Sequence, residues 1–469
     1  MSVCAVTEVQ GVKRVMANKE INFFKGHPSS RLLPREEIVR ATAAVLGPET
    51  REYDNDPYNR HPLTYGSDEG ALWVREQICE FLNDQVFRFD GGSPARTRPE
   101  YLNLDNGASY GMLNILLQTT LPHNGYTRQA FIITPTYFLI NDCLTDAGFN
   151  GKLTAINEKG HDSIDFESLL AALDQHEASA AAAAAAATNS AAGSDPTAMI
   201  QGSKLTKKIY KYVMYCIPTF ANPSGNTYSL ETRRRLIEIA RKYDMLVITD
   251  DVYDILDYTS AADQLPSPPL RMVHLDRATA APGEDSFGNT VSNATFSKLI
   301  APGLRFGYHE TINANLARQL SKGGANVSGG TPSQLNSMIV GELLRSGAAQ
   351  RCIAYLRSVY SERAAALTAA LKKYMPAGTE ISPLNGGYFC WITLPPAYNA
   401  KEIGSALAQK YNVILANGSN FEVVGDEKNW GQSSFRLSVS FLEPDQIERG
   451  IELFGAVCKD HAITNNIAM

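Results

Sequence analysis

The chain has 469 residues, 44% of them hydrophobic, and a formal net charge of −6. Because this length exceeds what one hydrophobic core usually serves, we expect about two domains. The mild acidity and the absence of a Lys/Arg-rich cluster argue against a nucleic-acid partner. No apolar run reaches the roughly 18–20 residues of a membrane helix, so no membrane partner is expected. The seven cysteines stand singly and residues 1–20 lack the apolar segment of a signal peptide, which indicates reduced thiols and a cytoplasmic protein.

The first two thirds of the chain alternate strands with helices. After a loosely structured start, Pro28 and Pro34 predict an extended arm. The spacing of apolar residues predicts helices over 35–46, 72–81, 112–117, 165–177 and 230–243. Strands are predicted over 101–105, 131–134, 152–156, 210–217 and 245–249. Residues 50–64 and the Pro-rich stretch 260–290 are expected to be loops. This alternation predicts an α/β fold whose mixed, mostly parallel sheet is flanked by helices.

The last third has a different pattern. A long helical segment over 331–374 precedes a strand at 386–393, a helix at 401–410 and a strand at 434–440. We therefore expect three parts: an arm with part of a small domain (1–60), a large domain (61–330) and a small C-terminal α+β domain (331–469). The Ala-rich tract 178–203 has no amphipathic face, so we expect a surface insertion in the large domain that is partly or wholly disordered.

One lysine stands alone in an uncharged stretch, residues 292–307. Lys298 follows the hydroxyl residues Thr295 and Ser297, and Arg305 comes after a Pro-Gly turn. Burial would lower the pKa of such a lysine toward the range in which a neutral amine attacks a carbonyl group. Arg305 stays charged and suits an anion such as a phosphate. The alternative is a surface lysine and arginine on either side of a turn.

A second anion site is predicted at residues 106–111, where a strand, a small-residue turn and a helix start meet. The same stretch, from Gly107 to Gly111, fits the G-x-S-x-G pattern of a serine hydrolase. That interpretation leaves the other polar motifs unexplained, and no oxyanion loop of the HGGG type is present. No Walker A, Rossmann or H-E-x-x-H pattern occurs either, and we expect no metal site.

Together, these motifs resemble the class I/II aminotransferases of the aspartate aminotransferase fold, which are fold-type I enzymes using pyridoxal 5′-phosphate. The stretch Thr295-Phe-Ser-Lys-Leu-Ile-Ala-Pro-Gly-Leu-Arg-Phe-Gly307 is similar to the S-x-S-K-x-x-x-P-G-L-R-x-G pattern of the kynurenine/2-aminoadipate aminotransferase and LysN branch. The resemblance runs from about residue 21 to the C-terminus. The threonine at 295, where relatives often have serine, keeps the hydroxyl group.

The resemblance implies a role for each matching residue. Lys298 would form the aldimine with the cofactor and move the proton between Cα and C4′, and Asp250 would pair with the pyridine nitrogen. Asn222 and Tyr253 would hydrogen-bond the 3′ oxygen attached to the ring. Tyr137 would stack on the ring. The phosphate would be held by Thr295, Ser297, Arg305 and the turn Gly107, Ala108, Ser109 and Tyr110, joined by Tyr65 from the other subunit of a homodimer. Arg436 would bind the substrate α-carboxylate. The arm with Gly26 would cover the substrate, and Arg31 would meet a side-chain carboxylate.

The resemblance implies a transaminase that moves the α-amino group of an aromatic, 2-aminoadipate-like or branched amino acid to a 2-oxo acid, with 2-oxoglutarate expected, through pyridoxamine phosphate. The same fold hosts cofactor-dependent lyases and enzymes that form C–C or C–N bonds, and the cofactor residues do not separate them. A non-enzymatic regulator that binds the cofactor is a third alternative. It would need a DNA-binding segment ahead of the match, which begins near residue 21.

Overall fold

The computed structural model describes residues 19–47, 53–186, 197–198, 201, 206–260, 265–280, 286–330 and 333–467. An eight-stranded sheet forms its larger part, in the order β2-β9-β8-β7-β6-β3-β4-β5. The strands are β2 (Leu102–Asp105), β3 (Gln129–Thr134), β4 (Leu153–Lys159), β5 (Ser163–Ile164), β6 (Tyr212–Cys216), β7 (Met245–Asp250), β8 (Thr290–Thr295) and β9 (Gly307–Thr311). Strands β4, β3, β6, β7 and β8 run parallel, while β5, β9 and β2 pair antiparallel. The predicted mixed, mostly parallel sheet is confirmed.

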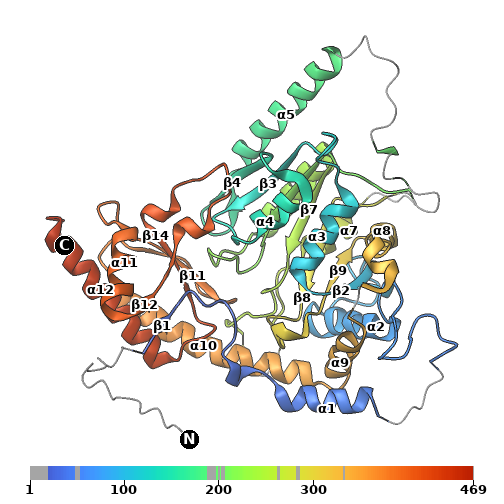
Figure 1. The fold of residues 1–469 in the computed structure, drawn as a ribbon, viewed down its shortest axis with the longest axis horizontal. Coiled ribbons are helices and arrows are strands. Elements are labelled where there is room, and N and C mark those ends of the chain that lie inside the picture. The colour runs from blue at the N-terminus through green and yellow to red at the C-terminus, as the bar shows by residue number, and fades with distance from the viewer. Residues whose placement is uncertain are drawn as a thin grey trace, which may run out of the picture.

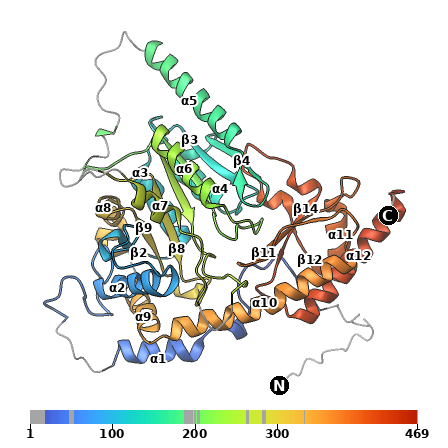
Figure 2. The same cartoon turned by 180° about the vertical axis from the view of Figure 1, so that it is seen from behind.

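Helices cover both faces of this sheet because its central strands are apolar on both sides. In β6, Tyr212 and Met214 belong to one hydrophobic cluster and Val213 and Tyr215 to the other. The first face packs against α5 (Phe166–Ala186), α6 (Leu230–Tyr243) and α7 (Met272–Thr279), and the second against α3 (Ala108–Thr119) and α4 (Ile140–Leu144). Figures 1 and 2 show these two layers from opposite sides. Helices α2 (Leu72–Glu80) and α8 (Ala314–Ser321) lie near the edge formed by β2.

A smaller layer follows, built on the four-stranded sheet β10-β11-β14-β13. Its strands are β10 (Glu380–Ile381), β11 (Phe389–Thr393), β13 (Ala416–Asn417) and β14 (Ser434–Ser438), and its helices are α11 (Ala400–Tyr411) and α12 (Pro444–Thr464). The N-terminal arm joins it, because β1 (Ile21–Asn22) pairs in parallel with β12 (Val413–Ile414). Figure 1 shows this arm beside the small layer and α1 (Arg35–Val45) beneath the large one.

One long helix connects the two cores. On α10 (Ala348–Tyr374), Ile353 and Tyr360 pack in the core of the large sheet, whereas Leu367 and Leu371 pack in the core of the small one. The division of the chain into domains at residues 60 and 330 stays a prediction.

Two segments differ from the sequence-based expectation. The predicted helix over 331–374 is two helices, α9 (Gln334–Arg345) and α10, separated at Gly347, whose φ of 71° ends one helix and starts the next. The predicted loop 260–290 contains α7, because Met272 and Val273 are buried against the sheet although prolines precede them. Gly347 was a local signal for the break, whereas the prolines before α7 hid that helix.

The Ala-rich tract is in part helical. Helix α5 continues through residues 178–186, and Figure 1 shows its end projecting from the body. Residues 178–186 are therefore ordered as helix, while most of the remainder, to residue 203, lies outside the described residues, and the partly disordered insertion stays a prediction. Over the described ranges, no helix is long and apolar enough to cross a membrane.

Candidate active site

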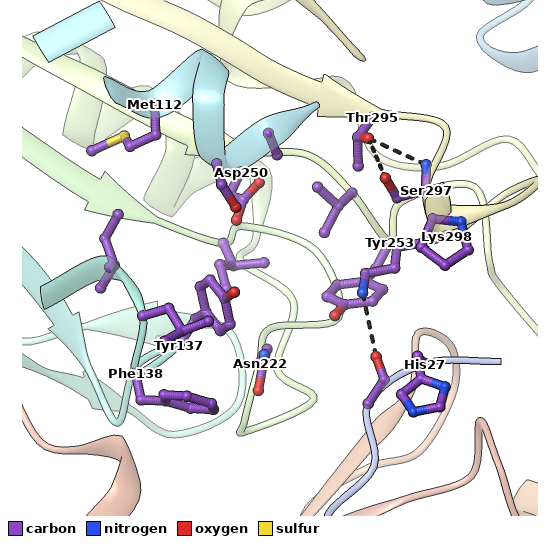
Figure 3. Close-up of a pocket in the computed structure, with 18 of the residues that line it drawn as sticks. His27, Met112, Tyr137, Phe138, Asn222, Asp250, Tyr253, Thr295, Ser297 and Lys298 are labelled. Carbon is purple, nitrogen blue, oxygen red and sulfur yellow. Dashed lines mark hydrogen bonds between the residues drawn. The ribbon is translucent and has the colours of Figure 1, made fainter. Parts of the chain in front are cut away.

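A cavity of about 440 Å³ lies where the carboxyl ends of the parallel strands face the small layer. Motifs distant in sequence meet there because each follows a strand of the same sheet. The predicted residues that line it are Gly26, Ala108, Ser109, Tyr137, Asn222, Asp250, Tyr253, Thr295, Ser297, Lys298, Arg305 and Arg436. Figure 3 shows Tyr253 next to Lys298, with Asp250 above and to the left of them, Tyr137 to the left and Asn222 below.

The lysine reaches into this cavity from the turn after β8. Its Nζ donates a hydrogen bond to the carbonyl of Gly26 at 3.3 Å and lies 5.5 Å from the centroid of the Tyr388 ring. Burial lowers the pKa of Lys298 to about 8, helped by the positive charges of Arg436 and Arg305 and opposed by Asp250. An appreciable fraction of neutral amine is therefore present near neutral pH, which a carbonyl-attacking nucleophile requires.

The carboxylate of Asp250 has one satisfied and one unsatisfied oxygen. Its Oδ2 accepts a hydrogen bond from the Tyr215 hydroxyl at 2.7 Å. Its Oδ1 is buried and has no hydrogen-bond partner among the described residues. Burial raises the pKa of Asp250 to about 6, against the Tyr215 hydrogen bond. A cationic N–H donor in the cavity would complete this carboxylate and keep it ionised.

An anion-binding corner is formed by the turn before α3 and by Arg305. Gly107 has φ 94°, and a Cβ there would lie 2.6 Å from Nη2 of Arg305, so only glycine lets the guanidinium approach the turn. The first turn of α3 leaves N–H groups without partners inside the helix. Arg305 donates to Oγ of Ser297 at 3.3 Å, and the Thr295 hydroxyl lies 2.9 Å from the same oxygen. Hydroxyl, guanidinium and N–H donors thus converge, which suits a phosphate group.

Arg436 is held on the opposite side of the cavity by β14. Its guanidinium donates to Oδ1 of Asn222 at 3.1 Å and to the carbonyl of Phe24 at 2.6 Å, and it lies 4.1 Å from the Phe389 ring centroid. Burial lowers its pKa to about 10, so it remains charged at neutral pH. A buried, fixed guanidinium is suited to binding a carboxylate with two hydrogen bonds.

Four predicted residues lie outside the cavity. Gly107 and Tyr110 adjoin it, and the Tyr110 hydroxyl donates to Asn326 at 3.3 Å. Tyr65 is 72% exposed at a surface opening that it shares with Arg305. The side chain of Arg31 is 59% exposed and is ion-paired with Glu443, so the structure does not bring it to the cavity.

Several lining residues were not predicted from the sequence. Tyr215 is the most informative, because a hydroxyl on a buried strand needs a partner. Its place in β6, next to the strand that ends at Asp250, is the signal that could have identified it. The aromatic wall was also missed, since its rings, among them Phe24, Phe138 and Phe389, come from three distant segments.

Comparison with known proteins gives the family. The model of the class I and II aminotransferases matches residues 59–454. An uncharacterized protein from Saccharomyces cerevisiae is 82% identical over 454 residues, which are 97% of this chain and 100% of that protein. The 2-aminoadipate transaminase of Thermus thermophilus is 31% identical over 247 residues, 52% of this chain and 57% of that protein.

Solved structures show the same fold. The multiple substrate aminotransferase from Thermococcus profundus superposes with a TM-score of 0.71 at 19% identity, over 97% of each chain. LysN, an α-aminoadipate aminotransferase from Thermus thermophilus solved with N-(5′-phosphopyridoxyl)-L-leucine, has a TM-score of 0.66 at 22% identity, over 95% of this chain and 93% of that one.

The residues in the cavity fit pyridoxal 5′-phosphate, the cofactor of this family. The unsatisfied Oδ1 of Asp250 suits the protonated pyridine nitrogen, and the corner at Gly107 and Arg305 suits the phosphate. Lys298 supplies the amine for the aldehyde, and its lowered pKa matches that use. The chain belongs to the class I and II aminotransferases, with the fold-type I architecture and pyridoxal 5′-phosphate as cofactor.

Proposed function

We propose that this protein transfers the α-amino group of an amino acid to a 2-oxo acid, with 2-oxoglutarate as the acceptor. The observation that carries the proposal is the pairing of a lysine and an arginine across one cavity, Lys298 at the cofactor side and Arg436 at the substrate side. A lysine alone would suit many cofactor-dependent reactions. The added buried guanidinium provides a fixed site for the carboxylate that every α-amino acid and 2-oxo acid carries.

The bound cofactor supplies an aldehyde carbon that bonds to amines and a protonated ring that accepts electrons. Asp250 would hold the ring nitrogen in its protonated form, and Tyr215 fixes the carboxylate for that purpose. Asn222 and Tyr253 would donate hydrogen bonds to the 3′ oxygen attached to the ring. Their positions in the cavity support these roles.

Arg436 binds the substrate α-carboxylate in place of the carbonyl of Phe24, one of its two present partners among the described residues, the other being Asn222. The carboxylate is thereby fixed, and the Cα–H bond is oriented toward Lys298. The neutral Nζ of Lys298 would then remove the proton from Cα of the substrate and deliver it to C4′, the former aldehyde carbon of the cofactor. The aromatic wall at Phe24, Phe138 and Phe389 excludes water from this exchange.

The expected amino donors are aromatic, 2-aminoadipate-like or branched amino acids. The aromatic wall supports apolar side chains, and the relative named 2-aminoadipate transaminase supports a longer acidic one. Arg31 would serve the distal carboxylate of such a substrate only if the arm moved, because it now pairs with Glu443.

The proposal includes a cytoplasmic homodimer. The exposed Tyr65 ring beside the opening at Arg305 supports a shared site, in which Tyr65 reaches the phosphate corner of the partner subunit. All six cysteines within the described residues are free thiols, which supports a reducing compartment.

The test is an amino-donor screen with 2-oxoglutarate held constant. We expect glutamate and the donor's 2-oxo acid to form in equal amounts, and no product to form without an oxo acid. Release of ammonia or of a side-chain fragment without an oxo acid would contradict the transaminase and indicate a lyase of the same fold.

A further inference from the structure

A buried carboxylate lies beneath the phosphate corner, and none of the roles above uses it. Asp105 ends β2 and is 1% exposed, and His309 on the neighbouring strand β9 is 0% exposed. Oδ1 of Asp105 accepts a hydrogen bond from the backbone N–H of Gly107 at 2.7 Å. Oδ2 lies 3.3 Å from Nε2 of His309. The carboxylate therefore contacts the turn that holds the phosphate on one side and a histidine on the other.

Two further glycines make room for this pair. A Cβ at Gly307 would lie 2.7 Å from Oδ1 of Asp105, and a Cβ at Gly111 would lie 2.8 Å from Oδ2 and 2.7 Å from Nε2 of His309. Such distances are too short for any other residue without a shift of the pair or the backbone. The backbone of β9 and of α3 thus closes on the carboxylate and the imidazole directly, with no side chain between them.

The proton of the imidazole can be placed from its neighbours. Nδ1 of His309 lies 3.0 Å from Nδ2 of Asn103, which only donates, so Nδ1 accepts and the proton of a neutral ring is on Nε2, facing Asp105. Oδ1 of Asn103 is buried without a hydrogen-bond partner among the described residues. Rotation of this amide would let Oδ1 accept a proton from Nδ1 instead. Nε2 of His309 and Oδ2 of Asp105, 3.3 Å apart, have no hydrogen-bond partner among the described residues, so this second tautomer would leave Nε2 free to accept from a protonated Asp105.

The charges around the pair favour a proton on Asp105 when an anion binds above it. Burial raises the pKa of Asp105 to about 7, against the hydrogen bond from Gly107 and the charge of Arg305. Burial lowers the pKa of His309 to about 4, so the ring is neutral. Asn293 of β8, which also faces the pair, is uncharged, and α3 contains no charged residue. An ionised Asp105 and a phosphate would share one turn as like charges.

We propose that Asp105 and His309 form a positioning pair for the cofactor phosphate, which fixes the turn at Gly107 and takes up one proton when the phosphate binds. The proton comes from the acid form of the buffer and goes to Oδ2 of Asp105, which becomes neutral. The His309 proton moves from Nε2 to Nδ1, where the rotated Asn103 amide accepts it, and Nε2 accepts the new O–H. Net charge and hydrogen bonds balance, and no other reactant is needed.

This proposal rests on the cofactor site and not on the reaction. Because binding takes up a proton, affinity for the phosphate falls as pH rises. The fall is at most about tenfold per pH unit, and it occurs at pH values between the pKa of Asp105 in the free protein and its higher pKa in the bound protein. At low pH the carboxyl group is neutral in both states, and the dependence disappears.

The experiment measures binding of pyridoxine 5′-phosphate to the full-length apoprotein. This probe has the ring and the phosphate but no aldehyde, so it forms no bond with Lys298. Isothermal titration calorimetry in buffers of different ionisation enthalpy counts the protons taken up, and affinity is measured from pH 6 to 8.5. The matched variant is Asp105→Asn, whose Oδ1 can still accept from Gly107 but which does not titrate.

We expect the wild-type protein to take up more protons near pH 7.5 than Asp105→Asn, and its affinity to fall several-fold more steeply with pH. The titrations of the probe and of Lys298 are common to both proteins and cancel in the difference. Equal proton uptake and equal pH slopes would overturn the proposal. If the variant does not fold, wild-type binding of pyridoxine without phosphate decides the question: the proposal requires the additional proton uptake to vanish, and its persistence would contradict it.

Discussion

The floor and the rim of the cavity are built in different ways. On the floor, Asp250, Asn222 and Lys298 follow buried strands of one sheet, so the order of the strands sets their positions. On the rim, the arm pairs with the small layer through a strand of only two residues, Ile21 and Asn22, and side-chain contacts such as the Ser440 hydroxyl on the carbonyls of Lys25 and His27 hold the rest. The floor gathers its predicted residues, whereas Arg31 on the rim points to Glu443. The order of strands in the sheet thus fixes the position of a residue at a strand end. The position of a residue on the arm depends on contacts with distant residues, which the sequence around it does not predict.

If the floor carries the chemistry, the largest effect should come from Asp250→Asn. The asparagine cannot hold a protonated pyridine nitrogen by charge, so we expect kcat/KM to fall by on the order of 10²–10³, comparable to the loss of a preorganised electrostatic contact. Steady-state kinetics with 2-oxoglutarate measures this. The matched control is Asp251→Asn: Asp251 does not line the cavity and accepts from the hydroxyls of Thr249 and Ser292. We expect that variant to lose stability more than kcat, and equal kinetic losses in the two variants would count against the assignment.

The substrate side of the comparison is tested by Arg436→Lys. A lysine keeps the charge but loses the two-pronged geometry and the bond to Asn222, so we expect KM for the amino acid to rise roughly 10- to 100-fold, as for a lost hydrogen bond to a charged group. The fall in kcat should be smaller. An unchanged KM would show that another group binds the α-carboxylate.

A smaller effect is expected from Tyr215→Phe. The hydroxyl opposes the effect of burial on Asp250 and lowers its pKa, so its removal raises that pKa further. Ionised Asp250 then requires a higher pH, and the acid limb of the kcat profile should move upward by about one pH unit. The pH profiles of variant and wild type are compared in one buffer series. A downward shift or no shift would contradict the role given to Tyr215.

The smallest effect is expected at the rim, from Arg31→Ala. Its exposed ion pair with Glu443 contributes about 0–1 kcal/mol, so the free energy of unfolding should change little and KM for 2-oxoglutarate by less than about twofold. A rise of tenfold or more in this KM, with KM for an aromatic donor unchanged, would show instead that the arm moves and that Arg31 reaches a distal carboxylate.

The sequence was sufficient for most of the fold and for the floor of the site. Strands such as β6 and β7 were predicted because they are mostly apolar, and Asp250, at the end of β7, was given its role by the family resemblance. Lys298 and Arg305 were identified instead as a lone lysine and an arginine around a Pro-Gly turn, because the strands on either side of them, β8 and β9, contain too many hydroxyl and charged residues to be recognised by hydrophobicity.

Other features depend on contacts between distant segments. The aromatic wall combines the arm, the loop after β3 and β11, and no local pattern brings Phe24, Phe138 and Phe389 together. The hydrogen bond from Tyr215 to Asp250 and the enclosure of Asp105 by three glycines likewise require the register between neighbouring strands and helices. Alternation within one strand does not specify that register.

The central claim is that Lys298 bonds the cofactor, and one measurement tests it directly. The protein is loaded with pyridoxal 5′-phosphate, reduced with borohydride to fix any bond to an amine, digested and analysed by mass spectrometry. Lys25 also lines the cavity and serves as an internal comparison. We predict the pyridoxyl phosphate mass on Lys298 alone. Modification of Lys25 or another lysine, with Lys298 unmodified, would contradict the account.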